Sequence, residues 1–110
     1  MKIDQAKVRR EFDQAVNMGA AELGEWLGTE ESRKVGFKRD DASESVGHAS
    51  GRRIVKLLGK SIEELSDDDY AHMRKVVGYV HRHRAQRPEN IYTSRWRYSL
   101  MNWGHDPAKE

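Results

Sequence analysis

The feature that most constrains this chain is a long amphipathic stretch in its second half. Apolar side chains recur there every three to four residues, which is the spacing of one helix face, at Tyr70, Met73, Val76, Val77 and Val80. Ser66 and the three aspartates after it form a capping-box pattern, and Pro88 ends the stretch. The sequence therefore predicts a helix over residues 67–86.

The remaining apolar periodicity predicts further helices and no strand. Asp4 is a candidate N-cap for a helix reaching Val16, a second helix runs from Ala20 to Leu27, and residues 29–35 add one turn. A helix over 45–58 and a short one after Thr93 or Ser94 complete the set, while residues 36–44 have no period and predict a loop. We expect a single all-α domain over residues 1–110, a small bundle of four or five helices.

The helices over 45–58 and 67–86 are candidates for a helix-turn-helix-like pair. Such a pair could place one helix in the major groove of DNA. The connection from Gly59 to Ser66 is, however, longer than the usual short turn, and no run of Gln, Asn and Arg marks base-reading positions. Binding to shape or backbone is therefore favoured over reading of sequence.

The core of this bundle is expected to be thin. Leu, Ile, Val and Phe together account for 20 of 110 residues, so the aromatic rings of Trp26, Trp96 and Trp103 must supply much of the buried area. Small residues at Gly47, Ser50 and Gly51 lie near the apolar side of their helix, which predicts a tight crossing with another backbone. A thin core also favours completion by a partner or a second copy.

Several function classes are disfavoured by the composition. Without cysteine the chain has neither disulfides nor thiolate chemistry, and no apolar run suits a signal peptide or a membrane span, so we expect the cytoplasm. The five histidines show no metal-binding spacing, and His48 and His72 fit hydrogen-bonded helix residues better than catalytic ones. We expect no enzymatic activity, no metal and no cofactor.

Basic charge is concentrated in the second half of the chain. Residues 1–46 carry a net charge of −2 and residues 47–110 a net charge of +4. The segment from Arg74 to Arg97 contains seven basic residues and one acid, Glu89. Clustered Lys and Arg bind phosphates with release of counterions. We expect phosphate contacts from two basic segments, at Arg52, Arg53, Lys56, Lys75, Arg82, Arg84, Arg95 and Arg97. The competing interpretation is that these charges are solvated and serve the helix dipole.

The C-terminal aromatic residues allow two interpretations. Trp96 and Trp103 could stack on bases while Arg95 and Arg97 bind the phosphate backbone of the nucleic acid, as in proteins that bind single strands. Their i, i+7 spacing with Leu100 between them favours burial in the core instead.

Four stretches of the sequence resemble a family of short microbial proteins. They are FDQAVNMGAAELGEWLGTEES, ESVGHASGRRIVKLL, LSDDDYAHMRKVVGYVHRH and RWRYSLMNWGHDP, and the resemblance extends from about Glu11 to Pro107. This family is classed as a domain of unknown function and is often labelled a DNA-binding protein, which implies nucleic acid as the partner but assigns no residue a role. Gly19 and Gly24 depart from the pattern and predict a less regular second helix.

Charge and resemblance together favour DNA as the partner, bound as duplex with little sequence preference, and RNA is a second candidate. The alternative is a protein-interaction or homo-oligomerisation module, such as a homodimer, in which the face carrying Gly47, Ser50 and Gly51 completes the core across an interface.

Overall fold

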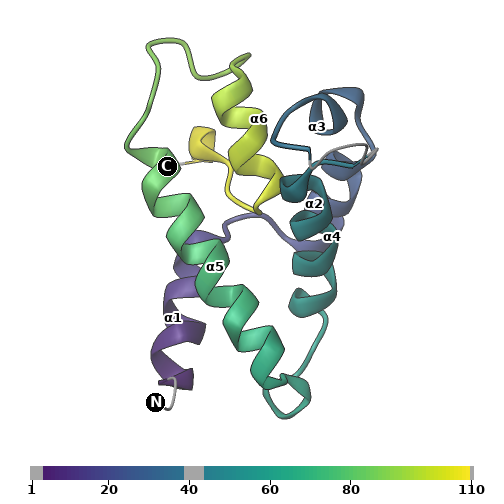
Figure 1. The fold of residues 1–110 in the computed structure, drawn as a ribbon, viewed down its shortest axis with the longest axis vertical. Coiled ribbons are helices and arrows are strands. Elements are labelled where there is room, and N and C mark those ends of the chain that lie inside the picture. The colour runs from purple at the N-terminus through teal and green to yellow at the C-terminus, as the bar shows by residue number, and fades with distance from the viewer. Residues whose placement is uncertain (1–3, 39–43, 110) are drawn as a thin grey trace.

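A computed structural model describes residues 4–38 and 44–109 of the chain. The described residues form an all-α fold, as the sequence predicts, in which six α-helices and two short 3₁₀ turns replace the expected four or five helices (Figure 1). The elements are α1 (Gln5–Ala15), α2 (Ala20–Leu27), α3 (Glu30–Lys34), α4 (Val46–Leu58), η1 (Ile62–Glu64), α5 (Asp67–Arg84), α6 (Arg95–Asn102) and η2 (Pro107–Lys109).

Side-chain caps fix where most helices begin. The hydroxyl of Ser66 accepts the backbone N–H of Asp69 at 3.1 Å, and the Asp69 carboxylate accepts the N–H of Ser66, so the predicted capping box is present. The side chains of Asp4 and Ser45 cap α1 and α4 by accepting the backbone N–H groups of Lys7 and His48, and of the two candidates for α6 the cap is Ser94. Local sequence signals therefore locate these helix starts correctly.

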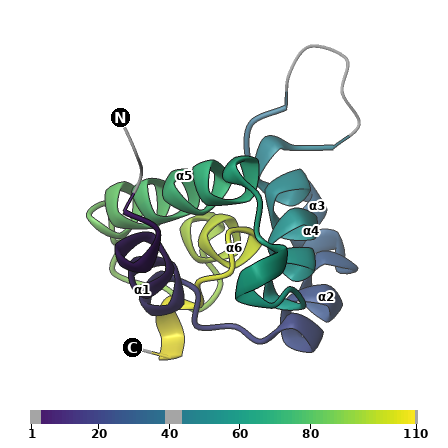
Figure 2. The same ribbon diagram turned by 90° about the horizontal axis from the view of Figure 1, so that it is seen from below.

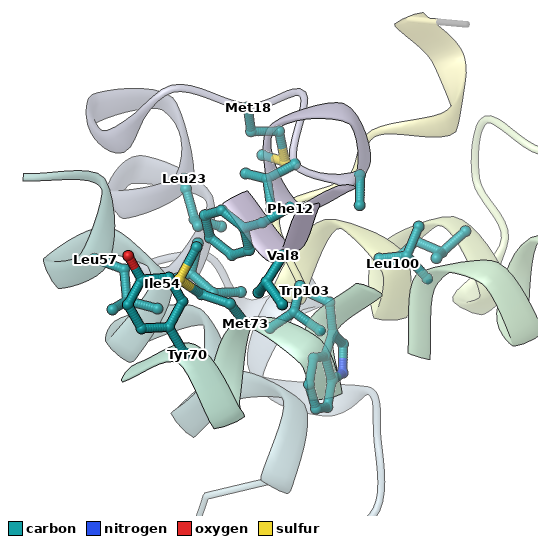
Figure 3. Packing of buried hydrophobic residues seen from close by; sticks show 14 of the residues in the cluster. Val8, Phe12, Met18, Leu23, Ile54, Leu57, Tyr70, Met73, Leu100 and Trp103 are labelled. Carbon is teal, nitrogen blue, oxygen red and sulfur yellow. The ribbon is translucent and has the colours of Figure 1, made fainter. Parts of the chain in front are cut away.

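The helices are arranged as two packed groups with α6 between them. The first helix α1 lies along α5, and α2 lies along α4, while α6 contacts α2, α3, α4 and α5 (Figure 2). Apolar side chains from both groups meet around α6 in one core, which includes Phe12, Leu23, Ile54, Met73 and Leu100 (Figure 3). The predicted stripe of α5 forms part of this core, because Tyr70, Met73, Val76 and Val80 are all buried.

Only one of the three tryptophans is fully enclosed. Trp103 is 4% exposed, whereas Trp26 and Trp96 pack against the core from its edge. The indole N–H of Trp26 donates to the buried side chain of Asn102 at 2.8 Å, and that of Trp96 donates to the His83 carbonyl at 2.6 Å. These bonds supply the polar partners that buried indoles require.

The predicted tight crossing at the small residues of α4 is present. A Cβ added at Gly51 would stand 2.5 Å from the carbonyl oxygen of Asn102 and 2.7 Å from a methyl of Leu27, and one at Gly47 would stand 2.8 Å from Nε1 of Trp103. These neighbours belong to the same chain. The small-residue face is therefore covered within the molecule, which corrects the hypothesis that it completes the core across an interface.

The second helix is regular, contrary to the prediction from its glycines. It runs without a break from Ala20 to Leu27 through Gly24, and a Cβ at Gly19 or Gly24 would meet nothing within 4 Å. Its buried residues Leu23 and Leu27 hold it against α4. Tertiary packing therefore outweighs the low helix propensity of glycine here.

The segment after α6 is packed onto the first link of the chain. Gly104 has φ +82°, a left-handed conformation that favours glycine, and its carbonyl accepts the backbone N–H groups of Asn17 and Met18. The side chain of Asn17 in turn bonds the backbone of Asp106. This exchange ties the α1–α2 link to the C-terminal turn.

Helices α4 and α5 diverge from the connection over residues 59–66, which contains η1 (Figure 1). This connection exceeds the three- to four-residue turn of a helix-turn-helix motif. Across residues 4–38 and 44–109, no helix combines the length and the apolar character needed to cross a membrane.

Candidate nucleic-acid interface

The cations of α4 lie on the face of that helix that points away from α2. The buried residues Gly47, Ser50, Ile54 and Leu57 occupy one side, so the helical period turns Arg52 and Lys56 outward to solvent. Arg53 lies between the two sides and is partly buried. The amphipathic pattern that builds the core therefore also displays the first basic segment.

Three adjoining hollows follow the line along which α4 and α5 face each other. They measure about 330, 390 and 320 Å³ and share lining residues, since Ala49 and Arg53 line the first and second and Val46 lines the second and third. We call this surface the α4–α5 seam. Its principal side chains are Arg52, Arg53, Lys56, Lys60, His72, Lys75, Tyr79 and Arg82.

The seam brings together five of the eight cations that the sequence predicts as phosphate contacts. Arg52, Arg53 and Lys56 line its α4 end, and Lys75 and Arg82 line the third hollow on the α5 side. Counting Lys60, six cations face two carboxylates among the described residues that line the three hollows. The net charge of the residues that line the seam is therefore positive.

The two acids of the seam are engaged by cations of α4 and its following turn. Asp69 accepts from Lys60 at 2.7 Å, from the N–H of Ser66 and from Arg53 at 3.3 Å, and these bonds hold the pKa of its carboxyl well below the usual range. Lys56, Lys75 and Arg82 form no ion pair with any residue in the described ranges. These three charges remain available to an anion.

Glu44 is the second acidic residue of the seam and lies just before the N-terminus of α4. Its carboxylate accepts two hydrogen bonds from Arg52 and also contacts Nδ1 of His48, so its pKa falls to about 2 despite partial burial. The other ring nitrogen of His48 lies 2.7 Å from the Leu27 carbonyl, which joins α4 to α2. The prediction that His48 is a hydrogen-bonded helix residue is confirmed.

His72 stands where α4 and α5 meet. Its Nε2 lies 2.9 Å from Oγ of Ser50, a buried residue of α4, so its expected hydrogen-bonded role is confirmed as well. Burial, with the positive charges of Arg53 and Lys75 on either side, lowers the pKa of His72 to about 4. Arg53 of α4 and Lys75 of α5 thus both act on the same imidazole.

Aromatic rings continue from His72 along α5. The ring of Trp103 stacks between His72 and Tyr79, with its centroid 4.3 Å from that of Tyr79, and Tyr79 in turn stacks on His83. Burial raises the pKa of the Tyr79 hydroxyl. No motif in the sequence marks Tyr79 as a site residue, although the i, i+3, i+7 and i+10 spacing of His72, Lys75, Tyr79 and Arg82 places all four on one helix face.

The other three predicted contacts lie outside the seam. Arg97 is bound to Asp106 through two hydrogen bonds of 3.0 and 3.2 Å, and its third nitrogen donates to the Tyr92 carbonyl. Arg95 donates to the Lys34 carbonyl, and Arg84 is the last residue of α5. The guanidinium of Arg97 holds a buried carboxylate, and none of the three arginines lines a hollow of the seam, so we leave Arg84, Arg95 and Arg97 out of the candidate interface.

Of the two interpretations of Trp96 and Trp103, the structure favours packing in the core over stacking on bases. Tyr79 covers a face of Trp103, and Trp96 packs on His83 with Arg87 above its ring. In the described part of the chain, no group of three or more His, Cys, Asp or Glu side chains is placed to hold a metal ion.

The family model described as "Protein of unknown function (DUF3140)" matches residues 11–101, and the chain belongs to that family. Comparisons with curated proteins and with solved structures give no match. The match covers all of α2 to α5 and most of α6, so it includes the principal seam residues from Arg52 to Arg82, while Asn102 and Trp103 of the third hollow follow its last matched residue.

Proposed function

We propose that this protein binds nucleic acid, without catalysis, by placing the phosphate backbone against the α4–α5 seam. The observation that carries the proposal is the excess of six cations over two carboxylates along three connected hollows. Phosphates neutralised by Lys and Arg release condensed counterions, which favours binding.

The extent of the seam suits a chain of phosphates better than a single anion. From Val46 to Lys56 the seam follows α4 for roughly 15 Å at the rise of an α-helix. Lys75 and Arg82 extend it along α5, two helical turns apart. A small anion would engage one end of this surface, whereas a nucleic-acid backbone can contact both.

Little dependence on base sequence is expected from the chemistry of the seam. Direct reading of bases relies on forked contacts from Asn, Gln and Arg in a groove. Asn102 is the one amide side chain among the described lining residues, and it is buried and bonded to Trp26 and Ser32. The cations therefore position a backbone, with DNA as the expected partner and RNA as a second candidate.

Titration of a labelled DNA duplex at several salt concentrations tests this proposal. We expect the logarithm of the association constant to fall linearly with the logarithm of salt, with a slope of several units. A slope near zero would instead favour a protein-interaction module.

A charge-matched pair of variants tests the assignment to the seam. Lys75→Glu with Arg82→Glu should weaken binding by at least about a hundredfold, because two phosphate contacts become repulsive. Lys7→Glu with Arg10→Glu changes the net charge equally on α1, which packs on α5 away from α4, and should have a small effect. Equal losses in both variants, with helix content intact by circular dichroism, would contradict the assignment.

A further inference from the structure

The third hollow of the seam differs from the other two because its walls are mainly aromatic and apolar. It is a groove of about 320 Å³ between the start of α4, the middle of α5 and the end of α6. Phe37 stands at its edge with 72% of its surface exposed, and Val46, Tyr79 and Trp103 form its apolar wall. Lys75 and Arg82 are the cations that line it.

The indole N–H of Trp103 has no hydrogen-bond partner in the described part of the chain, and although the residue as a whole is 4% exposed, its Nε1 is not among the fully enclosed polar atoms. The corresponding groups of Trp26 and Trp96 donate to Asn102 and to the His83 carbonyl. Figure 3 shows the Trp103 ring at the border of the core cluster, where it lines the groove. Because this N–H has no acceptor among the described residues and its nitrogen is not sealed from the groove, it is suited to an acceptor supplied by a ligand.

Gly47 keeps the space beside this donor open. A Cβ at this position would stand 2.8 Å from Nε1 of Trp103, closer than real Cβ contacts. Gly47 lines the same groove, so the missing side chain leaves the N–H accessible from it.

We infer that this groove binds an unpaired nucleotide, with an acceptor atom of the base on the Trp103 N–H and the phosphate on Lys75 and Arg82. The inference rests on the proposed function and deepens it, because it adds a base pocket to a surface that otherwise contacts phosphates. A nucleobase is flat and carries carbonyl or ring-nitrogen acceptors, which match an apolar wall with one donor.

The groove favours unpaired over paired bases for a geometric reason. A base inside a duplex is stacked on both faces, so it must leave the stack to enter a pocket, at a cost of a few kcal/mol. Single strands and duplexes with an unpaired end do not carry this cost. Phe37, on the exposed edge, offers a ring on which such a base can stack, since Tyr79 already covers a face of Trp103.

The three indole N–H groups provide a direct assay by nuclear magnetic resonance of ¹⁵N-labelled protein. Addition of oligothymidylate should shift the Trp103 indole signal, while the signals of Trp26 and Trp96, which have partners within the chain, should move little. Trp103→Phe identifies the signal by its loss. An abasic strand with the same number of phosphates should bind the seam without moving the Trp103 signal.

Affinity measurements with two variants provide a second readout. Gly47→Ala should weaken binding of oligothymidylate more than binding of the abasic strand, by about fivefold for one lost hydrogen bond. Phe37→Ala removes an exposed side chain and should have a similar selective effect without unfolding the protein, so it keeps the test valid if Gly47→Ala fails to fold.

The possible outcomes separate this inference from the proposed function. Binding of both strands with an unmoved Trp103 signal would overturn the base pocket and leave phosphate binding standing. Binding of neither strand would overturn both. Thymidine monophosphate that shifts the signal at the same concentration as the strand would support the pocket and make a free nucleotide its ligand.

Discussion

Oγ of Ser50 and Nε2 of His72 lie 2.9 Å apart, and this contact joins α4 to α5 near the middle of the seam. Ser50 is buried and His72 is half-buried, so the pair is largely removed from water. The neutral imidazole fits this position, because burial disfavours a protonated ring and Arg53 and Lys75 repel it more than Asp69 attracts it. Protonation of His72 would place a positive charge at this contact, so the stability of the fold depends on the protonation state of His72.

Stability is expected to fall in mild acid through His72. Its pKa is about 4 in the folded protein and about 6.5 in the unfolded chain, so the unfolded state takes up a proton first as pH falls. The contribution of this residue is present above about pH 6.5 and is lost towards pH 4. We expect the free energy of unfolding to drop by about 1–2 kcal/mol between pH 7 and pH 5, measured by urea denaturation.

His72→Gln isolates this effect from the carboxylates that titrate at lower pH. The variant keeps a polar side chain opposite Ser50 but cannot take up the proton. Its free energy of unfolding should change less over the same pH range. An identical pH dependence in both proteins would contradict the role given to His72.

Replacement of Arg97 by Gln should destabilise the fold and leave nucleic-acid binding largely intact. The variant removes both hydrogen bonds to Asp106 and leaves a buried carboxylate without its cation, which costs about 2–4 kcal/mol in the free energy of unfolding. Chemical denaturation measures the first effect. A titration with labelled DNA at a temperature where the variant is folded measures the second, and a large loss of affinity would return Arg97 to the interface.

Replacement of Asn102 by Leu should be among the most damaging changes in the core. Its fully buried amide accepts from the indole of Trp26 and from the hydroxyl of Ser32, and it donates to the Ser32 carbonyl. Leucine has a similar volume but leaves these groups unpaired, at an expected cost of about 2–4 kcal/mol. Thermal unfolding followed by circular dichroism checks this, and Asn90→Leu, on the exposed turn after α5, serves as the control.

The same substitution at two glycines should change stability in opposite directions. Gly24→Ala adds a methyl group in open space within α2 and should stabilise the protein by about 0.5–1 kcal/mol. Gly51→Ala drives a methyl group into the Asn102 carbonyl and Leu27, and should destabilise it by about 1–3 kcal/mol or more. Midpoints of urea unfolding for the two variants on opposite sides of the parent value would satisfy the prediction.

Much of the fold follows from local sequence signals. Ser45, Ser66 and Ser94 mark helix starts because a hydroxyl at that position satisfies a free backbone N–H whatever the tertiary context. The apolar stripe of α5 and the small residues of α4 likewise specify buried faces, since their spacing matches the helical period.

The candidate site was predictable only in part, because it depends on which helices meet. Arg52 and Lys75 were selected from charge alone, and the fold places them on one seam. Arg97 has the same local character, yet its partner Asp106 comes after a turn whose geometry the sequence does not reveal. The unpaired N–H of Trp103 is likewise a property of the folded groove.

The central position of α6 has a consequence for how the protein is made. Synthesis on the ribosome proceeds from the N-terminus, so α1 to α5 emerge before the helix that lies between their two groups. Until Leu100 and Trp103 arrive, the nascent chain exposes the apolar faces that these residues cover. Closure of the structure therefore has to wait for α6, and the growing chain is most open to chaperones and proteases before that helix arrives.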